Sequence, residues 1–297
     1  GTPPIIQTIR AALAFWVKEY IGYELIERQE HIYVEKALNR LLQNKNIKVL
    51  GNTSAKRQAI VSFLIYSTTN SYATDLKNEC DNDSREGKEE GLYMWGETGN
   101  KRDKPLHGAF VAALLNDLFG IQARGGCACA GPYGHSLLKV DEINSIAYRS
   151  AIKKGYVGVK PGWTRISFPY YMSNEEFEFI LAALEFIATY GQRFLTLYHF
   201  DLRTGSWSAR EKAILCLITN KNSNVPALPL ANGIKGTKVD NKQPKDRKTA
   251  EAKPNGMVTK FEMSLKTAIE IAHLLPKFPP QRRLQEELDL NLLYFRV

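Results

Sequence analysis

The sequence has no long apolar run and few cysteines, and both shortages restrict the class of protein. No stretch approaches the roughly 18 uninterrupted apolar residues of a membrane-spanning helix, so we expect no membrane span. The first apolar segment carries Arg10, Lys18 and Glu19, unlike the uncharged core of a secretory signal. Four cysteines in 297 residues are too few for a disulfide scaffold. The sequence therefore favours a reducing compartment, and we expect a cytoplasmic location.

The surplus of positive charge is concentrated in one segment. A net charge of +9 invites a nucleic-acid-binding interpretation. Residues 221–260, however, hold nine Lys or Arg against three Asp or Glu, in a stretch with few large apolar residues. This composition is typical of a linker, and no basic stripe interleaved with aromatic residues occurs in the rest of the chain. We therefore expect no nucleic-acid partner.

Composition divides the chain into three parts. Residues 1–210 form the predicted folded domain, which a polar and acidic insertion interrupts at 67–105. Residues 219–258 are rich in Asn, Lys, Pro and Gly, which predicts a disordered basic linker. Residues 259–297 are predicted to form a helical C-terminal tail whose leucine-rich end docks back onto the domain or binds a partner.

Apolar periodicity predicts alternating helices and strands within the folded part. Thr2-Pro3-Pro4 marks the start of a first helix, and we expect its apolar stripe from Ile6 to Tyr20 to lie in the core. Gly22 ends this helix. Further helices are predicted at 23–43, 107–120, 141–153, 174–190 and 260–274. Strands are predicted at 47–50, 58–66, 121–124 and 163–168, and a hairpin-like piece over 195–207.

The segment with the clearest chemical content is GIQARGGCACAGPYGH, residues 120–135. Here a predicted strand ends at Arg124 in a glycine-rich turn that exposes one or two thiols. Glycine lets the backbone approach a ligand closely. A neighbouring cation lowers the pKa of a thiol and favours the thiolate, which is the nucleophilic form.

This segment resembles the cysteine-bearing loop of class V aminotransferases, the family that includes cysteine desulfurases and selenocysteine lyases. In that loop a strand ends in Arg-x-Gly-x-x-Cys, and this chain has Arg124-Gly125-Gly126-Cys127-Ala128-Cys129. Aligned on Arg124, the family's persulfide-forming cysteine falls on Cys129 and not on Cys127. The resemblance therefore implies that Cys129 is the catalytic thiol.

Two further motifs resemble the same family and follow its order along the chain. Gly1-Thr2-Pro3 is similar to a Gly-Thr-Pro loop whose threonine reaches across a dimer to the cofactor phosphate, and a helix N-terminus suits a phosphate on physical grounds. Trp163-Thr164-Arg165-Ile166-Ser167 is similar to the strand whose arginine binds the substrate α-carboxylate. A planar guanidinium pairs with both carboxylate oxygens at once, which lysine cannot do.

The resemblance covers about residues 1–200 and implies an α/β fold. It implies the C-terminal small domain of the fold type I PLP-dependent transferase fold: an antiparallel sheet with helices packed on one face, preceded by a long connecting helix. It also implies pyridoxal 5'-phosphate as cofactor, an amino-acid substrate and a homodimer. Cys129 would be catalytic, Arg165 and Arg124 would bind the substrate, and Thr2 would bind the cofactor.

The family's Schiff-base lysine lies upstream of the Gly-Thr-Pro loop. We therefore expect the chain as given to be inactive alone, and the full-length protein to be a PLP-dependent transferase or lyase, of cysteine desulfurase type or another. The alternative is a non-catalytic interaction module with a decayed cofactor site.

Each candidate residue also has a structural interpretation. Cys129 can also be interpreted as a small buried apolar residue. Cys127 is better explained as a structural residue than as a functional one. Arg165 can also be interpreted as the partner of a surface carboxylate, and Thr2 can be interpreted as a helix cap. Cys127, Cys129 and His135 match zinc-ligand spacing poorly, so we expect no metal site.

Three further residues near these motifs have weaker interpretations. His107, at a predicted helix start, is better explained as a cap or packing group than as a catalyst. Tyr133 and His135 follow the cysteines closely enough to line the mouth of a pocket.

Overall fold

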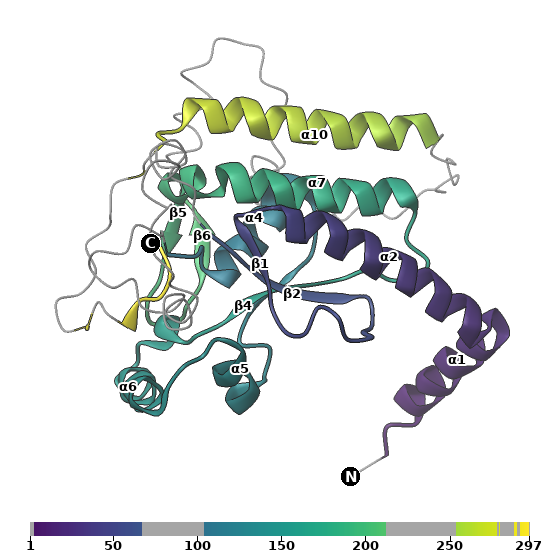
Figure 1. Cartoon of the computed structure of the whole chain (residues 1–297), viewed down its shortest axis with the longest axis horizontal. Coiled ribbons are helices and arrows are strands. Elements are labelled where there is room, and N and C mark those ends of the chain that lie inside the picture. The colour runs from purple at the N-terminus through teal and green to yellow at the C-terminus, as the bar shows by residue number, and fades with distance from the viewer. Residues whose placement is uncertain are drawn as a thin grey trace, which may run out of the picture.

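The computed structural model of the chain describes residues 3–66, 104–211 and 254–277, together with 279, 288–289 and 292–296. The predicted acidic insertion at 67–105, apart from its last two residues, lies outside the described residues. So do Thr2 and the predicted linker up to residue 253. The described part is a mixed α/β arrangement around a small antiparallel sheet (Figure 1).

A four-stranded antiparallel sheet lies at the centre of the described part, with strand order β1-β2-β4-β3. The strands are β1 (Ile47–Val49), β2 (Ile60–Ile65), β3 (Arg124–Gly126) and β4 (Trp163–Ser167). Side chains alternate between the two faces of a strand, so Val61, Phe63 and Ile65 point to one face, where all three are buried. Ser62 and Leu64 point to the opposite face.

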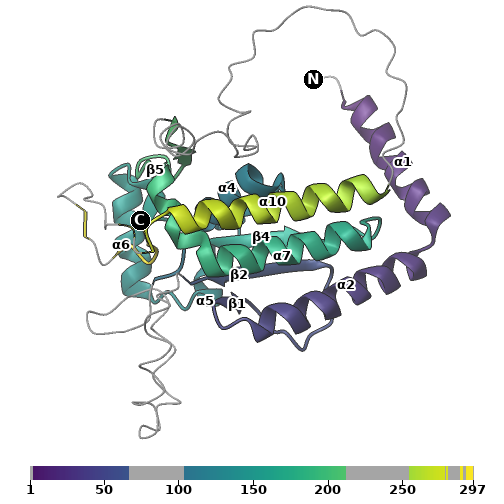
Figure 2. The same ribbon diagram turned by 90° about the horizontal axis from the view of Figure 1, so that it is seen from above.

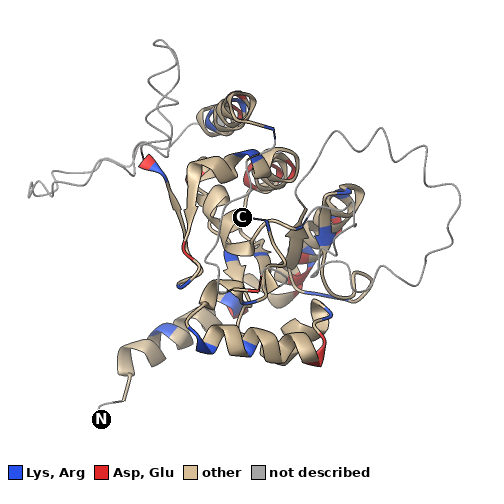
Figure 3. Cartoon of the chain, turned by 90° about the vertical axis from the view of Figure 1, so that its left-hand side faces the viewer, with Lys and Arg blue, Asp and Glu red and all other residues tan. Residues whose placement is uncertain are grey.

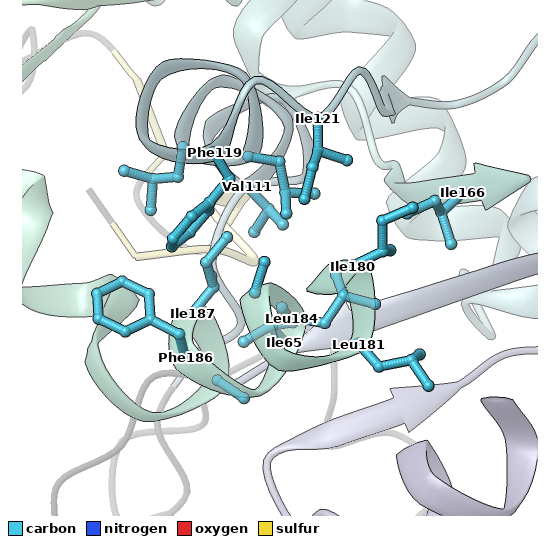
Figure 4. Packing of buried hydrophobic residues seen from close by; sticks show 14 of the residues in the cluster. Ile65, Val111, Phe119, Ile121, Ile166, Ile180, Leu181, Leu184, Phe186 and Ile187 are labelled. Carbon is cyan, nitrogen blue, oxygen red and sulfur yellow. The ribbon is translucent and has the colours of Figure 1, made fainter. Parts of the chain in front are cut away.

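Four helices lie on the side of the first face (Figures 1 and 2). They are α2 (Tyr23–Gln43), α4 (Gly108–Phe119), α7 (Asn174–Tyr190) and α10 (Pro254–Leu274). Ile180 and Leu184 of α7 point toward Val111 of α4 in the shared core (Figure 4). α10 packs on α7, where the rings of Phe261 and Phe179 stack with their centroids 4.1 Å apart. This side of the sheet holds the main core.

Local signals explain where two of these helices begin and end. At the start of α7, the Ser173 hydroxyl accepts a hydrogen bond from the backbone N–H of Glu176 at 3.1 Å. The Glu176 carboxylate accepts one from the backbone N–H of Ser173 at 2.9 Å, which completes a capping box. α4 ends at Gly120, whose φ of 68° is the left-handed conformation that glycine adopts at low cost.

Two further helices depart from the expectation that all helices pack on one face. α5 (Gly131–Leu137) and α6 (Glu142–Lys153) lie on the opposite side of the sheet (Figure 1). They share a second apolar cluster with Leu64 and Trp163, which strand alternation directs away from α7. This cluster covers only one end of the second face. Ser62 and Arg165 on the same face remain half-buried.

The chain between α4 and α6 also differs from the prediction. A strand is predicted at 121–124, but β3 occupies Arg124–Gly126, and the periodicity predicts no helix at the position of α5. Close packing explains the strand: a Cβ at Gly125 would lie 2.5 Å from the Cα of Ala109 in α4. Glycine is therefore required where the helix contacts the strand backbone.

The helix α1 (Ile5–Ile21) does not enter the core, so the prediction from its apolar stripe is wrong. None of its residues is buried, and the exposed fractions of Trp16 and Tyr20 are 64% and 93%. Gly22, with φ 92°, joins α1 to α2, and α1 points away from the sheet (Figure 2). Periodicity identifies an apolar face, but burial requires a packing partner, and the described residues supply none for α1.

The C-terminal segment packs back onto the domain. α10 begins at Pro254, so the boundary predicted between residues 258 and 259 falls inside a helix. Near the end of the chain, Tyr294 and Phe295 are buried in the second apolar cluster. The backbone N–H of Arg296 donates to the carbonyl of Pro105 at 2.9 Å. The described residues of the leucine-rich end, including Leu288, Leu292 and Leu293, are therefore part of the folded domain.

Charged residues of both signs are spread over the described elements (Figure 3). Arg40 of α2 lies between Glu178 and Glu185 of α7, with nitrogen–oxygen distances of 2.7 Å and 2.5 Å. Most of the basic surplus, by contrast, belongs to residues 221–260. No helix in the described ranges combines the length and the apolar character needed to cross a membrane.

His107 lies in an aromatic cluster beside the predicted hairpin, which forms as β5 (Tyr198–Phe200) and β6 (Trp207–Ala209). Short 3-10 helices, η2 (Val157–Val159) and η3 (Gly191–Leu197), connect the neighbouring elements. The His107 Nδ1 accepts a hydrogen bond from the Trp207 Nε1–H at 2.9 Å, and its ring centroid lies 4.3 Å from that of Phe295. Burial lowers the pKa of His107 from 6.5 to about 4. His107 is therefore neutral at pH 7 and acts in packing.

The contact of α4 with β3 predicts the effect of a single methyl group. Gly125→Ala places a Cβ against helix backbone, which cannot move aside as a side chain would, so we expect a loss of about 2–3 kcal/mol in the free energy of unfolding. Gly131→Ala is the matched control, because a Cβ there meets nothing within 4 Å, and its effect should stay within about 0.5 kcal/mol. Urea denaturation measures both. Equal stability of the two variants would contradict the packing.

The buried neutral His107 predicts a pH dependence of stability. Its folded pKa lies below its unfolded value, so its contribution is fully present above pH 6.5 and is lost as the pH falls toward 4. The loss across this window is up to about 3 kcal/mol. His107→Gln keeps an acceptor for Trp207 and should show a flatter decline in urea midpoint between pH 7 and pH 4.5. The exposed His199→Gln is the control and should decline like the parent chain. Parallel curves for all three proteins would exclude this role.

Candidate functional site

Two arginines lie side by side on the second face of the sheet. In the antiparallel pairing of β3 with β4, Arg124 is directly opposite Arg165, and in the pairing of β2 with β4, Arg165 is directly opposite Ser62. Directly opposite residues project to the same face, so all three side chains form one row across the sheet. Arg124 is exposed and Arg165 is half-buried. The structure thus brings together the two residues that we expect to bind the substrate.

The charge of this row is not compensated within the described residues. No carboxylate there forms an ion pair with either guanidinium. This argues against the surface-acid interpretation of Arg165. Like charges directly opposite each other on a sheet are destabilising, and an anion between them removes the repulsion. Two planar guanidiniums can hold a carboxylate or a phosphate by paired hydrogen bonds.

The cysteine turn follows β3 and returns Cys129 to Arg124. The backbone N–H of Ala130 donates to the carbonyl of Cys127 at 3.0 Å, and the central residues Ala128 and Cys129 have φ values of 51° and 58°. Positive φ at both central residues is typical of a type I′ turn, which is normally built from Asn and Gly. In other residues this conformation costs roughly 1–2 kcal/mol each, and such strain is concentrated at functional sites.

Arg124 contacts Cys129, the cysteine that the family resemblance implies is catalytic. Its Nη2 donates to the Sγ of Cys129 at 3.1 Å, and both residues are exposed. Because Arg124 is also the cross-strand neighbour of Arg165, the thiol and both guanidiniums belong to the same face. Cys129 is not a buried packing residue, so that interpretation is wrong.

Cys127 has a different environment, which the sequence pattern does not reveal. The residue is half-buried, which raises the pKa of its thiol, but a hydrogen bond from the Cys129 backbone and the nearby Lys160 ammonium outweigh burial. The net effect is a lowered pKa. The Cys127 thiol therefore loses its proton more readily than its burial alone would allow.

The backbone behind the turn is held by the C-terminal segment. Gly162 packs so closely that a Cβ there would lie 2.5 Å from the carbonyl carbon of Gly126 and 2.9 Å from the nitrogen of Cys127. The buried Tyr294 hydroxyl accepts from the Gly162 N–H at 2.7 Å and donates to its carbonyl at 3.2 Å. No local signal marks Tyr294, because this contact joins residues 132 positions apart.

The other predicted candidates are Tyr133, a metal site at the cysteine turn, and Thr2. Tyr133 of α5 is exposed, and its hydroxyl would lie 3.9 Å from a Cβ at Gly51. Cys127, Cys129 and His135 do not form a metal site, and the part of the chain that the structure describes contains no cluster of three such ligands. Thr2 lies outside the described residues, so its predicted role in phosphate binding stays a prediction.

A cavity of about 460 Å³ lies elsewhere, between α2, α7 and α10. Its lining includes Arg40, Glu178, Phe179 and Phe261, and the charge of Arg40 is already paired with glutamates. The cavity is on the helix-covered side of the sheet and is remote from the chemistry of the arginine row. The candidate site is therefore an open sheet face bounded by the cysteine turn and α5.

Comparisons of the chain with models of known families, with curated proteins and with solved structures find no match.

Proposed function

We propose that the open face binds the amino-acid substrate of a pyridoxal-phosphate-dependent site of the class V aminotransferase kind. One observation carries the proposal: Arg165 lies opposite Arg124, and Arg124 donates to the Cys129 thiol at 3.1 Å. Three motifs from separate parts of the sequence lead to the family, and two of them contribute side chains to one face of the sheet. The proposal includes a homodimer, since the family shares its active site across one.

The described residues fit the substrate end of such a site. Among the described residues no carboxylate pairs with the row of guanidiniums, and such a row suits an amino acid's α-carboxylate. The described elements leave Arg124 exposed and Arg165 half-buried, which gives room for the rest of the ligand. The cofactor end is assigned to Thr2 alone.

Each residue has a distinct role in this proposal. Arg165 binds and orients the α-carboxylate. Arg124 donates to the Cys129 sulfur at 3.1 Å and orients it across the face. Cys129 then acts on the substrate's side-chain atom as a nucleophile or proton donor. Pyridoxal phosphate, when bound, withdraws electrons from the substrate's α-carbon.

A non-catalytic interaction module is the second candidate, and one observation favours it. The apolar residues of α1 are exposed, including Trp16 and Tyr20, as in a helix that contacts another surface. In that function the arginine row is a remnant of a cofactor site. The two candidates differ in whether the protein binds pyridoxal phosphate.

Substitution of Arg165 tests the proposal in the protein expressed from its complete reading frame. We expect this protein to bind pyridoxal phosphate and to change its absorption spectrum on titration with L-cysteine or another amino acid. Arg165→Lys keeps the charge but loses the paired geometry, so the apparent Kd for the amino acid should rise about 10- to 100-fold.

Arg149→Lys is the matched control, because Arg149 is exposed on α6, away from the row, and its Kd should not change. A folded protein that stays colourless with added pyridoxal phosphate refutes the enzyme and favours the interaction module. A protein that binds the cofactor but has equal Kd values for both variants refutes the role of Arg165.

A further inference from the structure

The cysteine turn contains two thiols, and each has its own cation. Cys129 accepts a hydrogen bond from Arg124 at 3.1 Å. Lys160 and the backbone N–H of Cys129 lower the pKa of the Cys127 thiol against the effect of burial. Both thiols are free, and Cys129 is exposed. Two free thiols in one turn, each beside a cation, form a reactive pair and not two independent packing residues.

The geometry of the turn allows the two sulfurs to meet. Residues two positions apart span at most about 7 Å, and a hydrogen-bonded turn brings them closer. A disulfide needs Cα atoms about 4.4–6.8 Å apart. The backbone N–H of Ala130 donates to the carbonyl of Cys127 at 3.0 Å, so Cys127 and Cys129 belong to one tight turn. Little backbone movement is needed to join them.

We propose that Cys127 and Cys129 form an oxidisable dithiol that reacts with hydroperoxides and closes into an intramolecular disulfide. This inference does not depend on pyridoxal chemistry. If Cys129 is also the reactive thiol of the proposed function, closing the disulfide removes it and stops the reaction.

The chemistry proceeds in two balanced steps. The Cys127 thiolate attacks the terminal oxygen of the hydroperoxide, a sulfur–oxygen bond forms, and the oxygen–oxygen bond breaks to release an alkoxide or hydroxide. The Cys129 thiolate then attacks the Cys127 sulfenic sulfur, the sulfur–sulfur bond forms, and hydroxide leaves and takes up a proton. The thiols lose two electrons, which reduce the peroxide to water and an alcohol, or to water alone. The Lys160 ammonium favours the attacking thiolate.

The surroundings of Cys127 and Cys129 favour reaction with an oxidant over binding of a metal ion. Arg124 and Lys160 repel a metal cation at the position where the thiolates would bind it. The described residues also place no third His, Cys, Asp or Glu ligand with the pair. Lys160, in contrast, favours the Cys127 thiolate that reacts with a peroxide.

Peptide mapping of the full chain tests the inference directly. Cleavage after Arg124 and Lys139 releases residues 125–139, which contain Cys127 and Cys129 but neither Cys80 nor Cys216. After treatment with one equivalent of hydrogen peroxide, this peptide should lose two hydrogens and resist alkylation, and dithiothreitol should reverse both changes. A peptide that stays reduced while Cys80 or Cys216 is oxidised, or that is joined to either of them, overturns the inference.

Single substitutions test which thiol attacks the peroxide and which thiol then forms the disulfide. Cys129→Ser should leave a Cys127 sulfenic acid that dimedone captures, whereas Cys127→Ser should react slowly. Lys160→Met should slow oxidation about 3- to 10-fold, because the thiolate fraction falls as the thiol pKa rises. The exposed Lys153→Met is the control and should oxidise like the parent chain. If Cys127→Ser oxidises as fast as the parent, Cys127 is not the attacking thiol, and the proposal fails irrespective of cofactor binding.

Discussion

The pairing of β3 with β4 depends on close backbone packing, and the candidate site depends on that pairing. α4 contacts β3 at Gly125, where a Cβ would lie 2.5 Å from helix backbone, and the chain before β4 contacts the cysteine turn at Gly162. A larger residue at either position would separate the layers. The register that sets Arg124 opposite Arg165 is therefore a consequence of packing by residues that take no part in the chemistry.

Two features of this region oppose stability, and the surrounding structure holds both in place. The guanidiniums of Arg124 and Arg165 repel each other, and Ala128 and Cys129 adopt positive φ. Tyr294 fixes the backbone behind the turn through Gly162. Repulsion and strain that a fold retains on an exposed face are typical of a site that acts on an anion or through a thiol, and both interpretations of the cysteines rest on this argument.

Much of the fold could be predicted because its elements carry strong local signals. The helix predicted at 23–43 forms as α2, and the strand predicted at 163–168 forms as β4 at 163–167, since their apolar residues recur at the helical and strand periods. The prediction fails where glycine forms a strand through close packing, and where an apolar helix face stays exposed. β3 is built on two glycines that no strand propensity favours, and α1 has the apolar stripe of a core helix without a partner that covers it.

The sequence by itself determined which side chains can do chemistry here: an arginine five residues before a cysteine, a second arginine on a predicted strand, and a glycine-rich turn at the end of another predicted strand. Only the tertiary structure decided that Arg165 lies opposite Arg124, that Lys160 lowers the pKa of the Cys127 thiol, and that Tyr294 supports the turn. The physical reason is that apolar periodicity and helix capping depend on residues a few positions apart in the same segment. Contacts between distant segments follow from how the layers pack, which no local pattern encodes.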